Sequence, residues 1–275
     1  MTPEEIEDAF GQAAPAQVFR ERCFLHCGFS AGIALNPLRI ESMLQEMIHV
    51  PGLRGNPERA YPVTGTGPLY PGTFENYTAS VILRWQKDKL SNDVELISDL
   101  QKIHMARSVF AHRISDVAIE LRVGMLRERA HNLDNIADVG FGVSQVLPVV
   151  VALRAADEGR LVYLEEPEIH LHPLAQTKLA EVLANAAKRG VRVVAETHSS
   201  LLLTGIQTLV AKGELPAEIV KLHWVQRDAR TGISRVCSAD LDENGAFGNW
   251  PEDFDDVTLS ADRQYMDAVT ARSSG

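Results

Sequence analysis

The stretch Leu161-Val-Tyr-Leu-Glu-Glu-Pro-Glu-Ile-His-Leu-His-Pro173 decides how the rest of the chain is interpreted. It opens with a short apolar run, residues 161–164, which ends in two carboxylates, Glu165 and Glu166, followed at once by Pro167. A short apolar run bounded by a breaker is typical of a buried strand. Because proline cannot donate a hydrogen bond to a neighbouring strand, this strand is predicted to end near Glu166.

The following segments predict the order strand, helix, strand, helix. Residues 174–189 carry apolar side chains at helical spacing, with Pro173 suited to the first turn and Gly190 to the C-terminal cap. A second apolar run, residues 191–195, predicts another strand, and residues 199–212 predict another helix. Such a unit forms a parallel pair of strands with a right-handed crossover.

Polar side chains come after both predicted strands: Glu165 and Glu166 after the first, and His198 after the second. Parallel strands end on the same edge of a sheet, and open α/β sheets bind ligands there. Alternation along a strand predicts that Glu165 and Glu166 point in opposite directions, so that one can hold a cation while the other faces an attacking water. Phosphoryl transfer needs such an arrangement. The alternative is that these carboxylates only solvate the sheet edge.

Three segments resemble ABC-type/AAA ATPases of the RecF, SMC and OLD group. Residues 161–173 resemble the Walker B segment and the loop after it, and residues 195–200, Ala-Glu-Thr-His-Ser-Ser, resemble the switch-histidine segment. Residues 138–148, Asp-Val-Gly-Phe-Gly-Val-Ser-Gln-Val-Leu-Pro, resemble the signature motif. The resemblance covers residues 130–215 well and the flanks more loosely.

The resemblance implies a role for each matching residue. Glu165 would be the carboxylate near Mg²⁺, Glu166 would polarise the attacking water, and His198 would contact the γ-phosphate of ATP. The signature would close on a nucleotide held by another head, through Gly142, Val143, Ser144 and Gln145. The signature departs from the commonest form at Gly140, where a serine is usual.

The phosphate loop of such ATPases, Gly-x-x-x-x-Gly-Lys-Ser/Thr, has no counterpart in the sequence. No lysine follows a glycine, and none precedes a serine or threonine. The chain is therefore expected to correspond to the C-terminal half of an ATPase. Three explanations are open: a fragment of a longer gene product, one subunit of a split ATPase, or a degenerate regulator that binds a head without turnover. Loss of the N-terminal lobe would leave an exposed sheet edge and apolar face.

The resemblance implies an α/β fold, the C-terminal part of a P-loop NTPase of the ABC-head type, with parallel strands, flanking helices and a helical lid-like insertion. Residues 1–50 are expected to form a partial N-terminal or insertion segment. Residues 51–137 are expected to form a loop and helical lid-like region with a strand hairpin. Residues 138–275 would hold the signature, Walker B and switch segments and a C-terminal hairpin and tail.

Spacing of apolar residues predicts further elements. Ile40, Met43, Leu44, Met47 and Ile48 lie at the spacing of an amphipathic helix. The other predicted elements are helices at residues 75–88 and 93–108 (the second capped by Asn92), a half-buried strand at residues 119–123, and a hairpin formed by residues 219–225 and 233–238.

Several polar residues could be assigned to sites, but simpler interpretations are favoured. Arg54 and Arg59 lie in a Gly/Pro-rich region, where lone arginines are more often surface ion pairs than phosphate ligands. His170 and His172 alone make a poor zinc site. The group Cys23, His26 and Cys27 lacks a second pair at zinc spacing, so buried thiols are favoured.

Composition limits the class of protein. The net charge of −10 argues against a nucleic-acid-binding surface over the whole molecule, although it allows a local basic patch. Three cysteines in 275 residues provide no disulfide framework. The sequence shows no signal peptide and no apolar run of membrane-spanning length, which predicts a cytoplasmic chain without membrane contact.

The leading hypothesis is an ATPase that binds ATP and Mg²⁺ and hydrolyses ATP, provided that a phosphate loop is supplied from outside this chain. The resemblance implies a second ATPase head or an N-terminal lobe as partner, in a homo- or hetero-oligomer, and DNA handling or phage defence with a DNA or nuclease effector. One alternative is a non-hydrolysing interaction or regulatory module. Another is a metal-dependent nuclease or phosphatase that uses Glu165, Glu166 and the pair His170 and His172.

Overall fold

A computed structural model describes residues 37–126, 133–228 and 230–248 of the chain. Contacts divide the chain into two compact units, Met1–Glu46 and Met47–Gly275. The described part of the first unit is helix α3 (Pro37–Glu46). The group Cys23, His26 and Cys27 lies outside the described residues.

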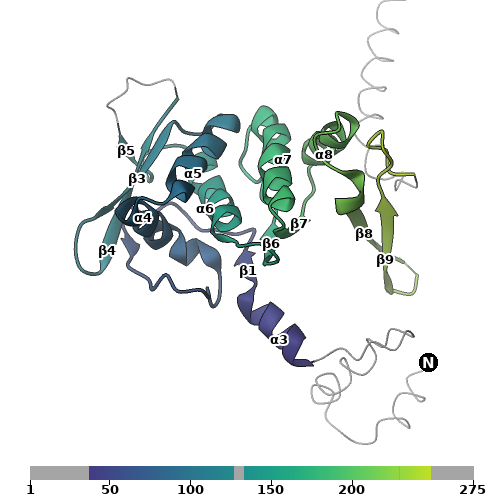
Figure 1. The fold of residues 1–275 in the computed structure, drawn as a ribbon, viewed down its shortest axis with the longest axis horizontal. Coiled ribbons are helices and arrows are strands. Elements are labelled where there is room, and N and C mark those ends of the chain that lie inside the picture. Colours follow the sequence, from purple (N-terminus) through teal and green to yellow (C-terminus); the bar gives the residue numbers. More distant parts are fainter. Residues whose placement is uncertain (1–36, 127–132, 229, 249–275) are drawn as a thin grey trace, which may run out of the picture. The chain divides into compact units, whose positions relative to one another are not determined.

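A three-stranded parallel sheet forms the centre of the second unit. Its strands are β1 (Ile48–Val50), β6 (Leu161–Glu165) and β7 (Arg192–Glu196), in the order β1-β6-β7 (Figure 1). Helix α7 (Pro173–Lys188) connects β6 to β7. The predicted strand–helix–strand unit with parallel strands is therefore confirmed, and the fold is α/β with flanking helices.

One face of this sheet is packed and the other is open. Ile48, Val50, Val162 and Leu164 are fully buried, on the face that helices α6 (Phe141–Ala155) and α7 cover. Alternate residues of β7 are exposed, among them Val194 with 50% of its surface accessible. Within the part of the chain that the structure describes, helices therefore cover only one face of this sheet.

Helix α7 begins and ends as its sequence predicts. Pro173 occupies the first turn, and the side chain of His172 accepts a hydrogen bond from the N–H of Leu174 as an N-terminal cap. Gly190, just beyond the helix, has a φ of 82°, which a glycine adopts without strain.

Helix α8 (Ser200–Ala211) packs closely on α7. A Cβ atom added at Gly205 would lie 2.8 Å from the carbonyl oxygen of Thr177 and 2.7 Å from the Cβ of Ala180. Since backbone cannot yield as a flexible side chain does, this glycine sets the distance between the two helices.

Replacing Gly205 by Ala should therefore lower the free energy of unfolding, by about 1–3 kcal/mol, because α8 must move away from α7. Urea denaturation followed by circular dichroism measures this change. Gly67→Ala is the matched control, since a Cβ there meets nothing within 4 Å. Equal stability of Gly205→Ala and the wild type would contradict the prediction.

A second, antiparallel sheet is formed by the part of the chain between β1 and β6. Strands β2 (Tyr61–Pro62), β4 (Ala118–Gly124) and β3 (Ser108–Arg113) form it in this order, and β5 (Asp134–Asn135) also pairs with β4. Ile119, Leu121 and Val123 are buried, which confirms the alternation read from the sequence. A short 3-10 helix η1 (Phe74–Tyr77) leads into α4 (Thr78–Asp88), which packs on β3 and β4.

Two helix predictions need correction. Ile48 belongs to strand β1 and not to the amphipathic helix, because pairing beside β6 overrides helical spacing. Helix α5 (Ser91–Lys102) ends well before Ser108, which opens β3, and His104 has a φ of 57° that ends helical geometry. Asn92 is not the cap: Leu90 is the N-cap residue, and the Asn92 side chain donates to the carbonyl oxygen of Arg154.

The predicted C-terminal hairpin is confirmed. A short 3-10 helix η2 (Ala217–Ile219) precedes strands β8 (Lys221–Arg227) and β9 (Ser234–Asp240), which pair antiparallel. None of the helices in the described ranges combines the length and apolar character that crossing a membrane requires.

Candidate functional site

Strand-end polar residues gather at one edge of the parallel sheet. Glu165 closes β6 directly opposite Glu196, which closes β7. The N–H of Glu166 donates to the carbonyl oxygen of Glu196 at 2.8 Å. His198 follows two residues later, in the loop before α8. The structure thus brings Glu165, Glu166 and the segment of His198 to the same edge.

The carboxylate of Glu165 is oriented by β1 and the segment that follows it. Its Oε1 lies 2.9 Å from Nε2 of His49, and its Oε2 accepts a hydrogen bond from the N–H of Gly52 at 3.0 Å. The Gly52 N–H, and after it His49, hold the pKa of the Glu165 carboxyl below its ordinary value. The group is therefore ionised at neutral pH, and each oxygen keeps a second lone pair for a cation.

Glu166 lies in a turn rather than in the strand. Strand β6 ends at Glu165, and Glu166 has a φ of 41°, in the left-handed region that costs a non-glycine residue energy. The expectation that strand alternation sets the direction of the Glu166 side chain was therefore wrong, because Glu166 lies in a turn beyond the end of the strand. The carbonyl oxygen of Glu166 accepts hydrogen bonds from the N–H of Ile169 at 3.1 Å and from Arg54 at 3.0 Å.

Arg54 is a buried residue of this site. Only 8% of its surface is exposed, and its guanidinium donates to the carbonyl oxygens of Pro51, Glu165 and Glu166 at 3.0, 3.1 and 3.0 Å. Burial lowers the pKa of Arg54, and nearby carboxylates act in the opposite direction, with Glu168 the strongest of them.

The surface interpretation is thus wrong for Arg54 and confirmed for Arg59. Arg59 forms an ion pair with Asp138 at 2.5 Å in which the two side chains are 72% and 48% exposed. The place of Arg54 follows from strand β1, because a chain leaving β1 beside β6 must pass the end of β6, and this three-residue strand gives no periodic signal in the sequence.

A row of side chains crosses the open face next to this edge. The rings of His49 and Tyr163 stack with centroids 5.2 Å apart and planes 15° apart. The hydroxyl of Tyr163 donates to Oε2 of Glu196 at 3.1 Å. Val194 is the neighbour of Tyr163 in register. This row, His49–Tyr163–Val194, forms a flat and partly apolar surface.

The residues that resemble the signature motif lie at the start of α6. Gly140 is the N-cap residue, and Phe141 is exposed. A Cβ atom at Gly142 would lie 3.4 Å from the carbonyl oxygen of His170, so this turn packs against the loop that follows β6.

The remaining signature side chains point inward. Val143, Ser144 and Gln145 are buried. Ser144 Oγ donates to the carbonyl oxygen of Phe141 at 2.9 Å, and Gln145 Nε2 donates to that of Gly55 at 2.8 Å. A ligand would therefore meet the backbone of residues 140–142 before it met these side chains.

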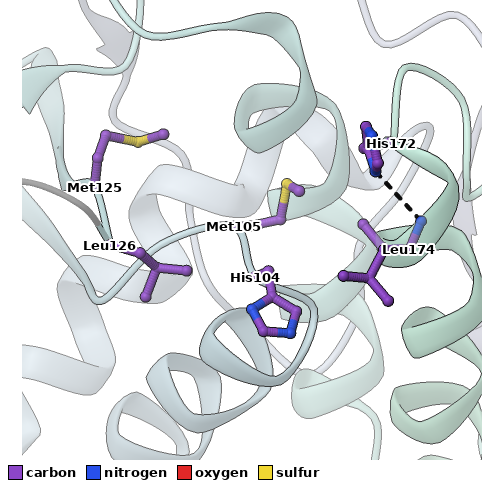
Figure 2. A pocket seen from close by; sticks show the side chains of 7 residues that line it. His104, Met105, Met125, Leu126, His172 and Leu174 are labelled. Carbon is purple, nitrogen blue, oxygen red and sulfur yellow. Dashed lines mark hydrogen bonds between the residues drawn. The ribbon is translucent and has the colours of Figure 1, made fainter.

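A pocket of about 450 Å³ lies beside the start of α7 (Figure 2). Its lining includes His104, Met105, Met125, Leu126, His172 and Leu174. Figure 2 shows His172 turned toward the backbone of Leu174, which donates to its Nδ1. The described residues that line the pocket include no carboxylate, so none of them supplies a carboxylate ligand for Mg²⁺.

The described residues contain no group of three or more His, Cys, Asp or Glu side chains placed to hold a metal ion. His172 already serves as a helix cap, and the ring of His170 lies 5.7 Å from that of Phe141. The hard carboxylate oxygens of Glu165 fit Mg²⁺, which commonly binds to one or two carboxylates and completes its shell with water and substrate phosphates.

A comparison with protein families gives one match. Residues 72–204, just under half of the chain, match the family described as "AAA domain, putative AbiEii toxin, Type IV TA system". The matched range contains residues 138–148, residues 161–173 and His198. This match supports an AAA-type, ATPase-like region. No curated protein matches the chain in sequence.

Solved structures with a similar fold include heads of SMC ATPases. One, described as "Structural biochemistry of ATP-driven dimerization and DNA stimulated activation of SMC ATPases", has 10% identity and a TM-score of 0.43, over 57% of this chain and 88% of its own. An Smc head bound to the C-winged helix domain of ScpA has 13% identity and a TM-score of 0.41, over 60% of this chain and 49% of its own. An Smc head domain with a coiled coil and joint from Pyrococcus yayanosii has 10% identity and a TM-score of 0.41, over 58% of this chain and 28% of its own.

Proposed function

We propose that the chain is the signature and Walker B half of an ATPase that binds ATP and Mg²⁺ and hydrolyses ATP once another lobe supplies the phosphate loop. The observation that carries this proposal is the meeting of Glu165, Glu166 and the segment of His198 at the carboxyl edge of one parallel sheet. Ligands of open α/β sheets bind at that edge.

Each of these residues has a distinct role in the proposal. Glu165, held by Gly52 and His49, would bind Mg²⁺, which when bound neutralises charge on the phosphate oxygens. Glu166, displayed by its turn, would orient and polarise the attacking water. His198 would contact the γ-phosphate. The turn formed by residues 140–142 would close on a nucleotide held by a second head.

The open side of the parallel sheet supports docking of the missing lobe. Among the described strands, β7 pairs only with β6, so its outer edge is unpaired. Parallel sheets are normally covered on both faces, whereas α6 and α7 cover one face here. A lobe that adds a strand beside β7 and covers the row His49–Tyr163–Val194 would complete the sheet.

Replacing Val194 by Lys should therefore prevent association with that lobe while the chain keeps its own stability, because this side chain is 50% exposed. Isothermal titration of the variant with the partner measures the loss, which we expect to be at least tenfold in affinity. Val236→Lys on β9 is the matched control, since Val236 is 68% exposed away from this sheet. Undiminished binding by Val194→Lys would place the lobe elsewhere.

The wider proposal concerns partners and context. ATP-dependent closure of two heads, as homo- or hetero-oligomer, would drive a DNA or nuclease effector in the cytoplasm, in DNA handling or phage defence. The description of the matched family as a putative toxin of a toxin–antitoxin system favours the defence role. In this proposal residues 51–137 form the lid-like region and residues 138–275 the ATPase lobe.

The first test is calorimetric titration with Mg²⁺-ATP, performed on the chain alone and on its mixture with the product of the adjacent upstream gene. Binding in the mixture alone supports a phosphate loop supplied from the partner. Tight binding by the chain alone would show that it grips nucleotide without such a loop. The alternative, a non-hydrolysing regulatory module, is favoured by the lack of a phosphate loop in the sequence and predicts no response in either case.

A further inference from the structure

Glu168 is a buried carboxylate that the proposed hydrolysis does not use. It lies two residues after Glu166, and only 6% of its surface is exposed. Its Oε1 accepts a hydrogen bond from the hydroxyl of Thr197 at 2.6 Å. Within the described ranges, its buried Oε2 has no hydrogen-bond partner. Because burying a charge is costly without compensation, such a residue needs a structural or functional reason.

Glu168 also acts on Arg54 electrostatically. Of the carboxylates that raise the pKa of Arg54 against the effect of its burial, Glu168 has the strongest influence. The same guanidinium bonds the carbonyl oxygens of Glu165 and Glu166, so one cation serves both the end of β6 and the buried acid. Glu168 is thereby tied electrostatically to the turn that displays Glu166.

Thr197 carries this connection to the next strand end. Its hydroxyl donates to Glu168 and accepts from the N–H of Ser199 at 3.0 Å. Ser199 Oγ in turn donates to Gln176 at 2.8 Å and accepts from the N–H of Leu202 at 3.1 Å, which caps α8. His198 lies between Thr197 and Ser199, so both of its neighbours in the chain are fixed.

We infer that Glu168 is a positioning residue: through Thr197 it holds His198 in a fixed place relative to the turn of Glu166. The structural part stands on the hydrogen bonds that run from Glu168 through Thr197 to Ser199. Its consequence for catalysis rests on the proposed function. In that function, His198 contacts the γ-phosphate and Glu166 orients the attacking water. Glu168 couples the two, because it lies two residues after Glu166 and bonds Thr197, the neighbour of His198.

The test removes the Thr197 hydroxyl while keeping its shape. In Thr197→Val the N–H of Ser199 loses its acceptor and Glu168 loses its donor. Hydrogen exchange of the Ser199 amide should become at least tenfold faster, and the NMR resonance of the His198 ring, assigned with His198→Asn, should shift. Thr197→Ser keeps a hydroxyl and should restore both. Unchanged exchange and resonance in Thr197→Val would overturn the inference.

A second measurement concerns catalysis. In the ATP-hydrolysing complex, Thr197→Val should lower kcat at least tenfold with KM for ATP nearly unchanged, and Thr197→Ser should recover most of it. Altered exchange with an unchanged kcat would overturn the catalytic part of the inference. If the wild-type complex hydrolyses no ATP, the proposed function fails. The exchange experiment on the full chain, repeated with Glu168→Met, then still decides whether Glu168 positions His198, because this variant removes the acceptor of the Thr197 hydroxyl but keeps the oxygen to which the Ser199 N–H donates.

Discussion

Replacing Glu166 by Gln should lower ATP turnover of the complemented complex by roughly 100-fold or more, the range that a positioned general base contributes. Glutamine keeps the size of the side chain and its turn but cannot take a proton from water. Since Glu165 and the bonds from Gly52 and His49 are untouched, Mg²⁺-ATP should still bind. Phosphate release measures turnover, and analytical ultracentrifugation with ATP measures association.

The expected combination, association without turnover, distinguishes a catalytic role from a structural one. Glu218→Gln is the matched control, because this carboxylate is exposed in η2, away from the strand ends, and its loss should change neither quantity. Unchanged turnover in Glu166→Gln would remove Glu166 from the role. Loss of both turnover and association would instead point to damage of the strained turn at Glu166.

The sequence predicted the parts of the fold that local patterns encode. The strand at Leu161–Glu165, the helix between Pro173 and Gly190 and the strand that follows were predicted because apolar runs, proline and glycine punctuate this stretch. The parallel-strand rule then placed Glu165 and His198 at the ends of neighbouring strands on one edge, without any coordinates. These predictions needed only contacts that are close in sequence.

The sequence did not predict contacts that join distant segments. Strand β1 has three residues, too few for a periodic signal, so Ile48 was assigned to a helix. With β1 missed, the bonds of His49, Gly52 and Arg54 to the end of β6 could not be foreseen, because they link residues more than 110 positions apart.

The structure also revealed burial that motif matching does not report. The signature match implied that Ser144 and Gln145 contact nucleotide, but both side chains are buried and bonded within the chain. The sequence analysis gave Glu168 no role, because a carboxylate in a loop is expected to face solvent unless a partner for it is known. Thr197, directly before His198, was the available sequence signal for that partner.

Replacing Arg54 by Met should destabilise the fold by about 3–5 kcal/mol, the cost of breaking a buried charge network by removing one partner. Methionine fills much of the space of the arginine stem but donates no hydrogen bond. The carbonyl oxygens of Pro51, Glu165 and Glu166 would each lose a donor, and buried Glu168 would lose its compensating cation. Urea denaturation followed by circular dichroism measures the change.

Arg59→Met is the control for losing a guanidinium at the surface, because Arg59 pairs with the carboxylate of Asp138 and both side chains are exposed. That variant should lose at most about 1 kcal/mol, as exposed ion pairs do. Arg54→Lys should fall between the two, since a lysine keeps the charge opposite Glu168 but cannot reach three carbonyl oxygens with a planar fork. If Arg54→Met were as stable as Arg59→Met, the guanidinium would not hold the end of β6, and the connection drawn from Arg54 through Glu168 to His198 would lose its first link.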